Sequence, residues 1–290
     1  MAVQNSLAKR QGKPTFSAYL TSDAVKNKIN QIVGGKDGAR FITAVVSAVS
    51  VNPALADCDH ASILSCALLG EALKLSPSPQ LGHYYMVPYK DNKRGITVAQ
   101  FQLGYKGYIQ LAIRSGYYKK INVLSIKEGE LIKFDPLNEE IEVVLYEDEE
   151  VRESKLSTGY YAMFEYHNGF RKVLYWSRKK MEAHASQYSK GYAEDKKRGT
   201  SWTFWSKDFD GMAYKTMLRQ LISKWGIMSI EMQSAMEKDM GVVADDGSVQ
   251  YVDNQDVIEA PPAAADAPEA PASENVESSF FGEGGMTNAQ

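Results

Sequence analysis

The stretch VAQFQLGYKGYIQLAIRSGYY, residues 98–118, decides the fold that we predict for this chain. Its first six residues follow the alternating pattern of a β-strand, and at Gly104 the spacing of apolar residues changes to that of a helix. This helix would place Lys106 and Arg114 on one polar ridge, and Gly116 is typical of the residue that ends a helix. The expected apolar face consists of Tyr105, Tyr108, Ile109, Ala112 and Ile113. The stretch therefore predicts a strand, a glycine joint and a short helix with a narrow cationic stripe.

The elements expected on either side of this stretch give an α+β fold, with N-terminal helices, central antiparallel β-hairpins around the short helix, and C-terminal helices. Asn168 and Gly169 predict a tight hairpin turn, because this dipeptide favours the two-residue turns that match the twist of the strands. A polar loop is expected at residues 189–205. Helices are expected at residues 22–33, 37–51, 60–75, 178–188, 207–225 and 229–240, and strands at 84–89, 96–103, 119–126, 141–146, 159–167 and 170–176.

Charge divides the chain into a basic body and an acidic tail. The 290 residues carry 33 Lys and Arg and 36 Asp and Glu, but residues 241–290 hold ten of the acidic residues and none of the basic ones. The first 240 residues therefore have 33 basic and 26 acidic side chains, a balance of +7. We expect a flexible basic arm at 1–20, a folded body at 21–240 and a disordered acidic tail, rich in Ala and Pro, at 241–290. A basic body indicates a polyanionic partner, or a tail that competes with one.

The cysteine content and the hydropathy pattern predict a cytoplasmic protein. Only Cys58 and Cys66 are present, which fits a reduced compartment. The first 16 residues lack the apolar segment of a signal peptide, and no run reaches the ~18 apolar residues of a membrane span. We therefore expect no membrane partner.

Motifs for covalent chemistry are absent from the sequence, which predicts a protein that is not an enzyme. It has no GxxxxGK[ST] phosphate loop, no GxGxxG and no GxSxG, and its four histidines lack zinc-ligand spacing. An acid-rich segment between Asp135 and Glu153 leaves open a Mg²⁺-dependent nuclease, because clustered carboxylates can hold Mg²⁺ for phosphodiester cleavage. We favour a charged strand edge that resists aggregation, and so predict no dedicated metal site.

Nucleic-acid binding explains the composition better. Non-specific binding of a single strand requires cations for the phosphates and aromatic surfaces for the bases, and the body interleaves the two. The candidate DNA-binding residues are Lys106, Arg114, Lys119, Lys120, Lys172, Lys196, Lys197, Arg198, Lys207, Lys215 and Arg219. The candidate base-stacking residues are Tyr105, Tyr108, Trp202 and Trp205, of which the two tyrosines lie on the predicted apolar face and are more often core residues.

Lys215 and Arg219 are the strongest candidates among these cations. They share one face of a predicted helix whose opposite face is apolar, so no packing role explains them. A surface salt bridge to Asp208 is the competing explanation, but such a pair contributes only ~0–1 kcal/mol. Lys119 and Lys120 are expected on opposite faces of a strand, so at most one of them would line a groove.

Three segments, in order, resemble the RecT family of phage single-strand DNA annealing proteins. They are YYMVPYK at residues 84–90, QFQLGYKGYIQLAIRSG at 100–116 and GMAYKTMLRQLISKWG at 211–226. The resemblance implies that the body at 21–240 binds single-stranded DNA in a basic groove, anneals complementary strands without ATP and assembles into rings or helical filaments. It carries the DNA-contact role to Lys106, Arg114, Lys215 and Arg219.

The resemblance also implies the surroundings in which the protein works. The expected partners are single-stranded DNA, the newly annealed duplex, further copies of the chain, a phage exonuclease and a host single-strand-binding protein, in the cytoplasm of a bacterial host cell. No cofactor is expected, while a Mg²⁺ dependence of DNA binding stays open. A single-stranded nucleic-acid-binding protein that does not anneal strands is the alternative from the same residues.

Overall fold

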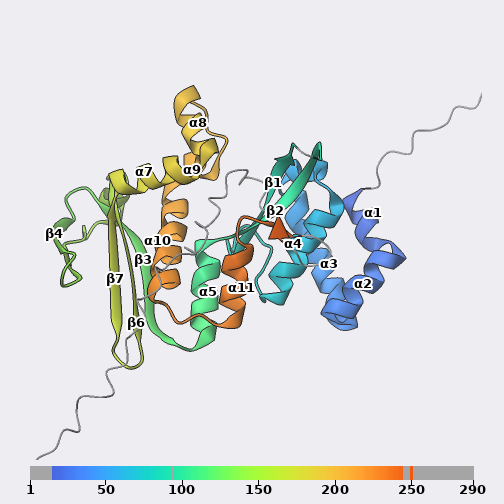
Figure 1. The fold of residues 1–290 in the computed structure, drawn as a ribbon, viewed down its shortest axis with the longest axis horizontal. Helices are drawn as coiled ribbons and strands as arrows, with labels where there is room; N and C mark the ends of the chain where they lie inside the picture. The colour runs from blue at the N-terminus through green and yellow to red at the C-terminus, as the bar shows by residue number, and fades with distance from the viewer. Residues whose placement is uncertain (1–14, 93, 244–248, 251–290) are drawn as a thin grey trace, which may run out of the picture. The chain divides into compact units, whose positions relative to one another are not determined.

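Strand β2 (Ile96–Leu103) meets helix α5 (Tyr105–Ser115) at Gly104, as predicted, in a computed structural model that describes residues 15–92, 94–243 and 249–250 (Figure 1). A Cβ atom at Gly104 would collide with the carbonyl oxygen of Gly82, so the joint requires glycine. A Cβ at Gly107 would likewise collide with the carbonyl oxygen of His83, which places Gly107 on the buried face of α5. That face is rotated from the predicted one: Ile113, expected to be buried, is 57% exposed.

The N-terminal helices form as predicted, with one addition. They are α1 (Phe16–Thr21), α2 (Asp23–Val33), α3 (Gly35–Ser50), the 3₁₀ helix η1 (Pro53–Asp57) and α4 (His60–Ala72). Helix α1 lies where the flexible arm was expected, because Phe16 and Leu20 are buried; the rest of that arm, residues 1–14, lies outside the described residues. Asp59 caps α4 by accepting a hydrogen bond from the Ser62 N–H (3.0 Å).

Two sheets and a separate hairpin follow from the middle of the chain. Strand β1 (Tyr84–Asp91) pairs with β2, and β3 (Tyr118–Lys127), β6 (Ser157–Tyr166) and β7 (Arg171–Ser177) form an antiparallel sheet in the order β3-β6-β7. Gly169 has φ 87° in the β6–β7 turn, as Asn-Gly predicts. The acid-rich segment contains the hairpin β4 (Leu131–Asp135) and β5 (Glu140–Val143) and helix α6 (Glu149–Ser154), of which only β5 was expected.

The C-terminal part of the body is helical. It comprises α7 (Arg178–Tyr188), α8 (Lys190–Arg198), α9 (Phe204–Lys207), α10 (Phe209–Trp225) and α11 (Ile230–Lys238). The prediction of a loop at 189–205 is wrong, since Ser189 and Thr203 cap α8 and α9. Helix α10 buries Met217, Leu218, Leu221 and Ile222 completely, the apolar side that its sequence predicted.

Ordered structure continues past Met240, where the tail was predicted to begin. Strands β8 (Val242–Val243) and β9 (Val249–Gln250) pair with each other, and the Phe101 N–H of β2 donates to the Gly241 carbonyl oxygen (3.0 Å). The expectation of disorder for the remainder falls on residues 251–290, outside the described residues. Within the part of the chain that the structure describes, no helix is long and apolar enough to cross a membrane.

Candidate nucleic-acid interface

Helices α8 and α9 are joined by a turn that closes around one buried carboxylate. Asp195, only 4% exposed, accepts hydrogen bonds from the hydroxyl groups of Thr200 (2.6 Å), Thr203 (2.8 Å) and Ser206 (2.7 Å). It also accepts hydrogen bonds from the backbone N–H groups of Trp202 (3.1 Å) and Thr203 (2.8 Å). These bonds, that from Thr200 first, hold the pKa of Asp195 well below its usual range. The turn is therefore built on an ionised carboxylate.

An aromatic cluster holds this pair of helices against the start of α10. Tyr192 of α8, Trp205 of α9 and Phe209 of α10 pack with ring centroids 5.1–6.0 Å apart. The guanidinium carbon of Arg178 lies 3.7 Å from the centroid of the Phe209 ring. Trp205 is buried by this packing, so its ring is not available to bases, contrary to its place among the stacking candidates.

The outer side of the turn presents cations and aromatic rings to solvent. Trp202 is 79% exposed and Phe204 is 41% exposed. We refer to the exposed residues of this region as the α8–α9 surface: Lys196, Lys197, Arg198, Trp202, Phe204 and Lys207. Arg198 pairs with Glu194 of its own helix (2.5 Å), whereas no ion pair engages the three lysines of this surface within the described part of the chain.

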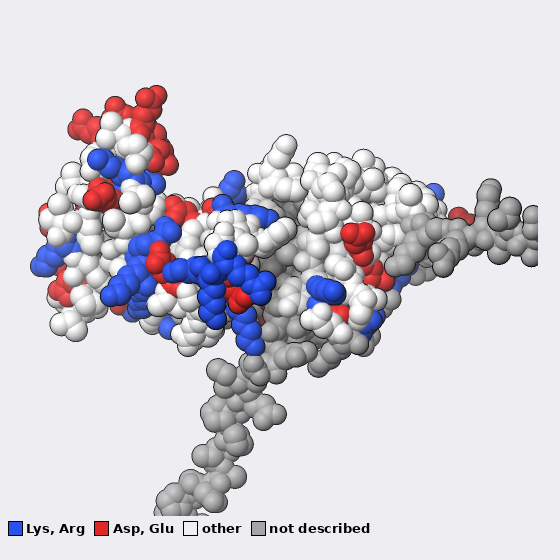
Figure 2. Space-filling model, turned by 90° about the horizontal axis from the view of Figure 1, so that it is seen from above, with Lys and Arg blue, Asp and Glu red and all other residues white. Residues whose placement is uncertain are grey.

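A segment distant in sequence extends the α8–α9 surface. The ring of Tyr85 in β1 lies 6.0 Å from that of Phe204. Tyr85 and Lys106 both lie against Gly82, since a Cβ there would be 2.9 Å from the Tyr85 hydroxyl and 3.4 Å from Cδ of Lys106. Lys106, the predicted cation of the central stretch, is exposed and therefore lies beside this surface. Figure 2 shows Lys and Arg side chains gathered on the face seen from above.

Lys215 and Arg219 lie elsewhere, around a second buried carboxylate. The Lys215 ammonium is 2.8 Å from Oδ1 of Asp239, and Arg219 is 3.0 Å from Oδ2. The same carboxylate accepts hydrogen bonds from the Leu103 N–H (2.9 Å) and the Tyr108 hydroxyl (3.4 Å). Burial lowers the pKa of Lys215, and the negative charge of Asp239 opposes that shift. We refer to these five residues as the Asp239 centre.

Lys215 and Arg219 therefore have a structural role, and the prediction that no packing role explains them is wrong. Lys215 is 6% exposed, so a strand at the surface does not reach its ammonium group, while the Arg219 side chain is 41% exposed. The competing partner was also misassigned, because Asp208 accepts from the Gly211 N–H (2.9 Å) and caps α10. The true partner comes from the end of α11, which the helix pattern of α10 could not indicate.

Arg114 holds the end of another helix. Its guanidinium donates to the carbonyl oxygens of Leu73 (2.7 Å) and Lys74 (2.9 Å), just past the last residue of α4. Lys74 has φ 53°, in the left-handed region that often ends helices. The DNA-contact role that the resemblance implied for Arg114 thus competes with a role in capping α4.

Lys119 and Lys120 lie together at one end of β3, contrary to the expectation of opposite faces. Lys120 pairs with Glu165 in the sheet register and Tyr118 with Tyr166, which makes Lys119 the extra residue of a β-bulge. Both ammonium groups reach the Glu165 carboxylate, at 2.5 Å and 3.8 Å. The bulge therefore removes the alternation on which the prediction relied.

Three further candidates have partners within the fold. Lys172 pairs with Glu139, and its ammonium lies 4.4 Å from the centroid of the Trp225 ring. Tyr108 is fully buried, and Tyr105 is half-buried with its ring edge-on to Tyr214, 5.4 Å between centroids. The structure thus leaves Trp202 as the most exposed of the four stacking candidates.

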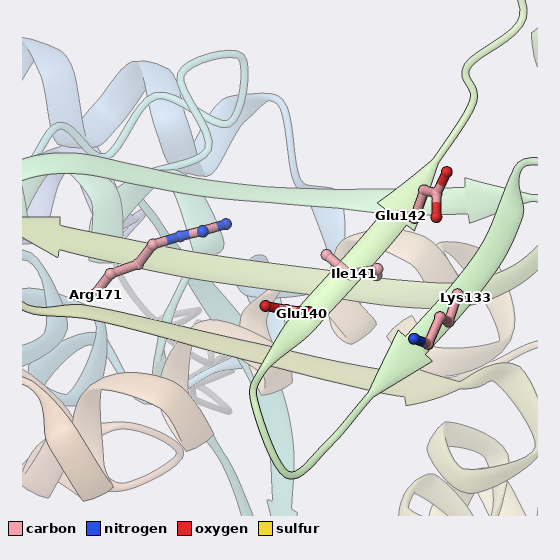
Figure 3. A pocket seen from close by; sticks show the side chains of 5 residues that line it. All are labelled: Lys133, Glu140, Ile141, Glu142 and Arg171. Atoms are coloured by element: carbon pink, nitrogen blue, oxygen red, sulfur yellow. The ribbon is translucent and has the colours of Figure 1, made fainter.

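The acid-rich segment borders an open pocket of about 320 Å³ between the β4–β5 hairpin and β7. It is lined by Lys133, Glu140, Ile141, Glu142 and Arg171, whose side chains Figure 3 shows spread along the strands without converging on one point. Asp135 accepts hydrogen bonds from its own turn, and Glu153 pairs with Lys127 (3.8 Å). No group of three or more His, Cys, Asp or Glu side chains that could hold a metal ion occurs among the described residues.

Sequence reasoning missed the residues that organise both carboxylate sites. Asp195 stands within a predicted loop, and its only signal was the run of Ser and Thr that follows it, TSWTFWS at residues 200–206. Tyr85 lay in a segment that resembles the family but was not chosen as a candidate, and Phe204 gave no signal apart from being aromatic. Asp239 lay one residue before the expected end of the body, and its partners are 24 and 20 residues earlier.

Comparisons with known proteins place these sites within a family match. The model of a family described as the RecT family matches residues 39–256. The chain is 36% identical over 274 residues to "Uncharacterized protein YqaK" of Bacillus subtilis (strain 168), over 94% of this chain and 89% of that protein. It is 30% identical over 246 residues to "Protein RecT" of Escherichia coli (strain K12), over 80% and 86% of the two chains. The matched residues include the α8–α9 turn and the Asp239 centre.

Proposed function

Because this chain belongs to the RecT family, we propose that it is a single-strand DNA annealing protein of phage-type recombination. In this proposal the α8–α9 surface, with Lys106 beside it, holds one DNA strand. Pairing with a complementary strand then proceeds without nucleotide hydrolysis and without any covalent step. In this proposal the protein is not an enzyme and has no dedicated cofactor site.

The observation that best supports this proposal is the composition of the α8–α9 surface. Its lysines have no ion pair within the described part of the chain, so a phosphate would not have to displace a carboxylate from them. Each cation that neutralises a phosphate releases condensed counterions, which drives binding of any sequence. The exposed Trp202 ring offers an aromatic face on which a base stacks irrespective of its identity.

Such a surface would let the bases supply the sequence recognition. Contacts to phosphates position a strand and carry no sequence information, so the Watson–Crick edges stay free to test a second strand. Assembly of several copies into a ring or filament would lengthen the surface and hold the strand extended. We propose that the body binds DNA and assembles in this way in the cytoplasm of a bacterial host, beside a phage exonuclease and a host single-strand-binding protein.

The test is annealing of two complementary oligonucleotides that carry a donor and an acceptor dye, each precoated with a single-strand-binding protein, in the absence of nucleotide. We expect the wild-type chain to accelerate pairing strongly and Lys196→Ala/Lys197→Ala to slow it. The matched control is Lys119→Ala/Lys120→Ala, which removes two adjacent lysines already shared with Glu165 and should keep most of the activity.

The other outcomes separate the alternatives. Binding of single strands without faster pairing would make the chain a coating protein. Shortening of a labelled strand incubated with protein and Mg²⁺ would indicate the nuclease. Equal losses in both double variants would place the strand elsewhere than on the α8–α9 surface.

A further inference from the structure

Several polar groups of the α8–α9 turn donate hydrogen bonds to a single buried carboxylate. Helix α8 ends at Gly199, whose φ of 66° reverses the chain, and the Thr200 N–H donates to the Asp195 carbonyl oxygen (3.0 Å). The next residues then wrap around the Asp195 side chain, so both the backbone and the carboxylate of one residue hold the turn. Ser206 completes the wrap from within α9.

Trp202 occupies the part of this turn that faces solvent. Its backbone N–H is held by the Asp195 carboxylate, while its ring is 79% exposed. Leaving a large aromatic ring in water gains nothing for the fold, since an exposed ring buries little apolar area. A fixed backbone under an exposed ring instead favours stacking on a base, because the point from which the ring extends is set before the base arrives.

The exposed cations next to Asp195 in sequence share the same support. Lys196, Lys197 and Arg198 form the last turn of α8, which is the turn that the Asp195 carbonyl and carboxylate fix. The separation between these cations and the Trp202 ring therefore depends on the hydrogen bonds of Asp195. A single strand bound there would place phosphates and a base at that separation.

We propose that Asp195 is a positioning residue for base stacking, whose buried carboxylate fixes the backbone from which the Trp202 ring extends beside the cations of α8. The inference rests on the proposed function, since it assigns roles within the same single-strand site. Asp195 itself contacts no DNA. It acts through the turn, and its negative charge would by itself weaken binding of a polyanion.

The experiment compares the affinities of the full chain for two strands of equal length, oligothymidylate and an abasic strand with the same phosphates. For the wild type, stacking on Trp202 should favour oligothymidylate by about fivefold to a hundredfold. In Asp195→Asn one acceptor oxygen is lost, so the turn cannot satisfy all its donors. We expect the preference to fall towards one. The affinity for the abasic strand should rise slightly, because a negative charge beside the cations is lost, while its dependence on salt concentration stays close to wild type.

Glu194→Gln is the matched control, because it removes the same charge from the neighbouring position of α8 without touching the turn. Its partner is Arg198, so both affinities should rise slightly and their ratio should not change. Thr200→Val, which removes one hydroxyl bond to Asp195, should lower the ratio in the same direction by less and serves if Asp195→Asn does not fold. Trp202→Ala should lower the ratio as far as Asp195→Asn does.

Two results would overturn the inference. If Asp195→Asn weakens binding to both strands equally, Asp195 only stabilises the fold. If Trp202→Ala leaves the ratio unchanged, the ring does not stack on a base. Either result leaves the proposed function standing if annealing is intact, whereas a wild-type chain that binds neither strand contradicts the proposed function itself.

Discussion

The α8–α9 surface and the Asp239 centre use similar residues to opposite ends. Both place cations on a helix near a buried aspartate. At the α8–α9 surface, the Asp195 carboxylate accepts hydrogen bonds from hydroxyl and backbone donors, and the neighbouring lysines stay exposed. At the Asp239 centre the carboxylate forms ion pairs with Lys215 and Arg219 themselves. Whether a helix cation is available to DNA therefore depends on what the nearest buried carboxylate already binds.

The Asp239 centre joins elements that are far apart in the chain. Its carboxylate links the end of β2 at Leu103, α5 through Tyr108, and α10 through Lys215 and Arg219, at the point where α11 ends. Two of the segments that resemble the family signature thus meet at one buried charge. For Lys215, this indicates that the signature residue holds the body together.

The largest effect is expected when the Asp239 centre loses its carboxylate. In Asp239→Ala the Lys215 ammonium stays buried without a counter-charge, and breaking a buried pair in this way costs about 3–5 kcal/mol of unfolding free energy. Urea unfolding followed by circular dichroism measures the loss. The control is Asp208→Ala, which removes a helix cap from the same helix and should cost about 1 kcal/mol. A stable Asp239→Ala protein that no longer binds DNA would reverse the comparison between the two sites.

The same variant should change how stability depends on pH. Burial lowers the folded-state pKa of Lys215 below its ordinary value of 10.5, so between the two values the unfolded chain binds more protons. Stability from this group therefore rises as the pH rises towards 10.5. Asp239→Ala removes the charge that raises this pKa. The difference in unfolding free energy between wild type and Asp239→Ala should therefore become smaller as the pH is raised from neutral. Adding Lys215→Met to Asp239→Ala should abolish this pH dependence. A loss of unfolding free energy that does not change with pH would argue against a buried charge as its cause.

Trp202, just before α9, and Trp205, within α9, allow packing and binding to be tested separately. Trp205→Ala should cost about 3–5 kcal/mol of unfolding free energy, because its ring is buried against Tyr192 and Phe209. Trp202→Ala should leave that free energy within about 0.5 kcal/mol and instead weaken single-strand binding by about 1–3 kcal/mol. Unfolding and fluorescence-anisotropy titrations on both variants give the comparison, and a Trp202 effect on stability alone would remove the ring from the proposed interface.

Most of the fold could be predicted because the spacing of apolar residues clearly indicates most of its helices and strands. The glycine joint at Gly104, the cap at Asp59 and the Asn-Gly hairpin each follow from local chemistry. What failed depended on partners distant in sequence or on an extra residue. The pairing of Lys215 required Asp239, and the common side of Lys119 and Lys120 required a bulge that no single-strand pattern encodes.

The sequence supplied some residues of the candidate surface, but not its geometry. Lys106 and the cations at 196–198 were both chosen from interleaving with aromatic residues, and the packing of Phe204 on Tyr85 brings them to one surface. Nothing in the sequence distinguished exposed Trp202 from buried Trp205, three residues apart in a segment of polar composition. The difference arises from the wrap around Asp195, which is a tertiary arrangement.

The salt dependence of binding gives a smaller but sharper comparison. If Lys196 and Lys197 neutralise phosphates, their replacement by Ala should reduce the slope of log affinity against log salt by about 0.7 for each lysine. Lys119→Ala/Lys120→Ala should reduce it by less, because their ammonium groups are shared with Glu165. Titrations at several salt concentrations measure both slopes. Equal slopes for the two double variants would mean that pairing with Glu165 does not prevent Lys119 and Lys120 from neutralising phosphates.

The smallest effect concerns Arg114, which tests whether a signature cation acts by charge or by shape. Its guanidinium bridges two carbonyl oxygens at the end of α4, and Arg114→Lys keeps the charge but cannot form both bonds from one planar group. We expect a loss of about 1 kcal/mol in unfolding free energy with little change in single-strand affinity. If Arg114 instead bound a phosphate, Arg114→Lys would change neither the unfolding free energy nor the single-strand affinity. Only Arg114→Ala would then weaken binding. Unfolding and binding measured on the same two variants decide between these roles, because capping follows the geometry of the donor and phosphate binding follows its charge.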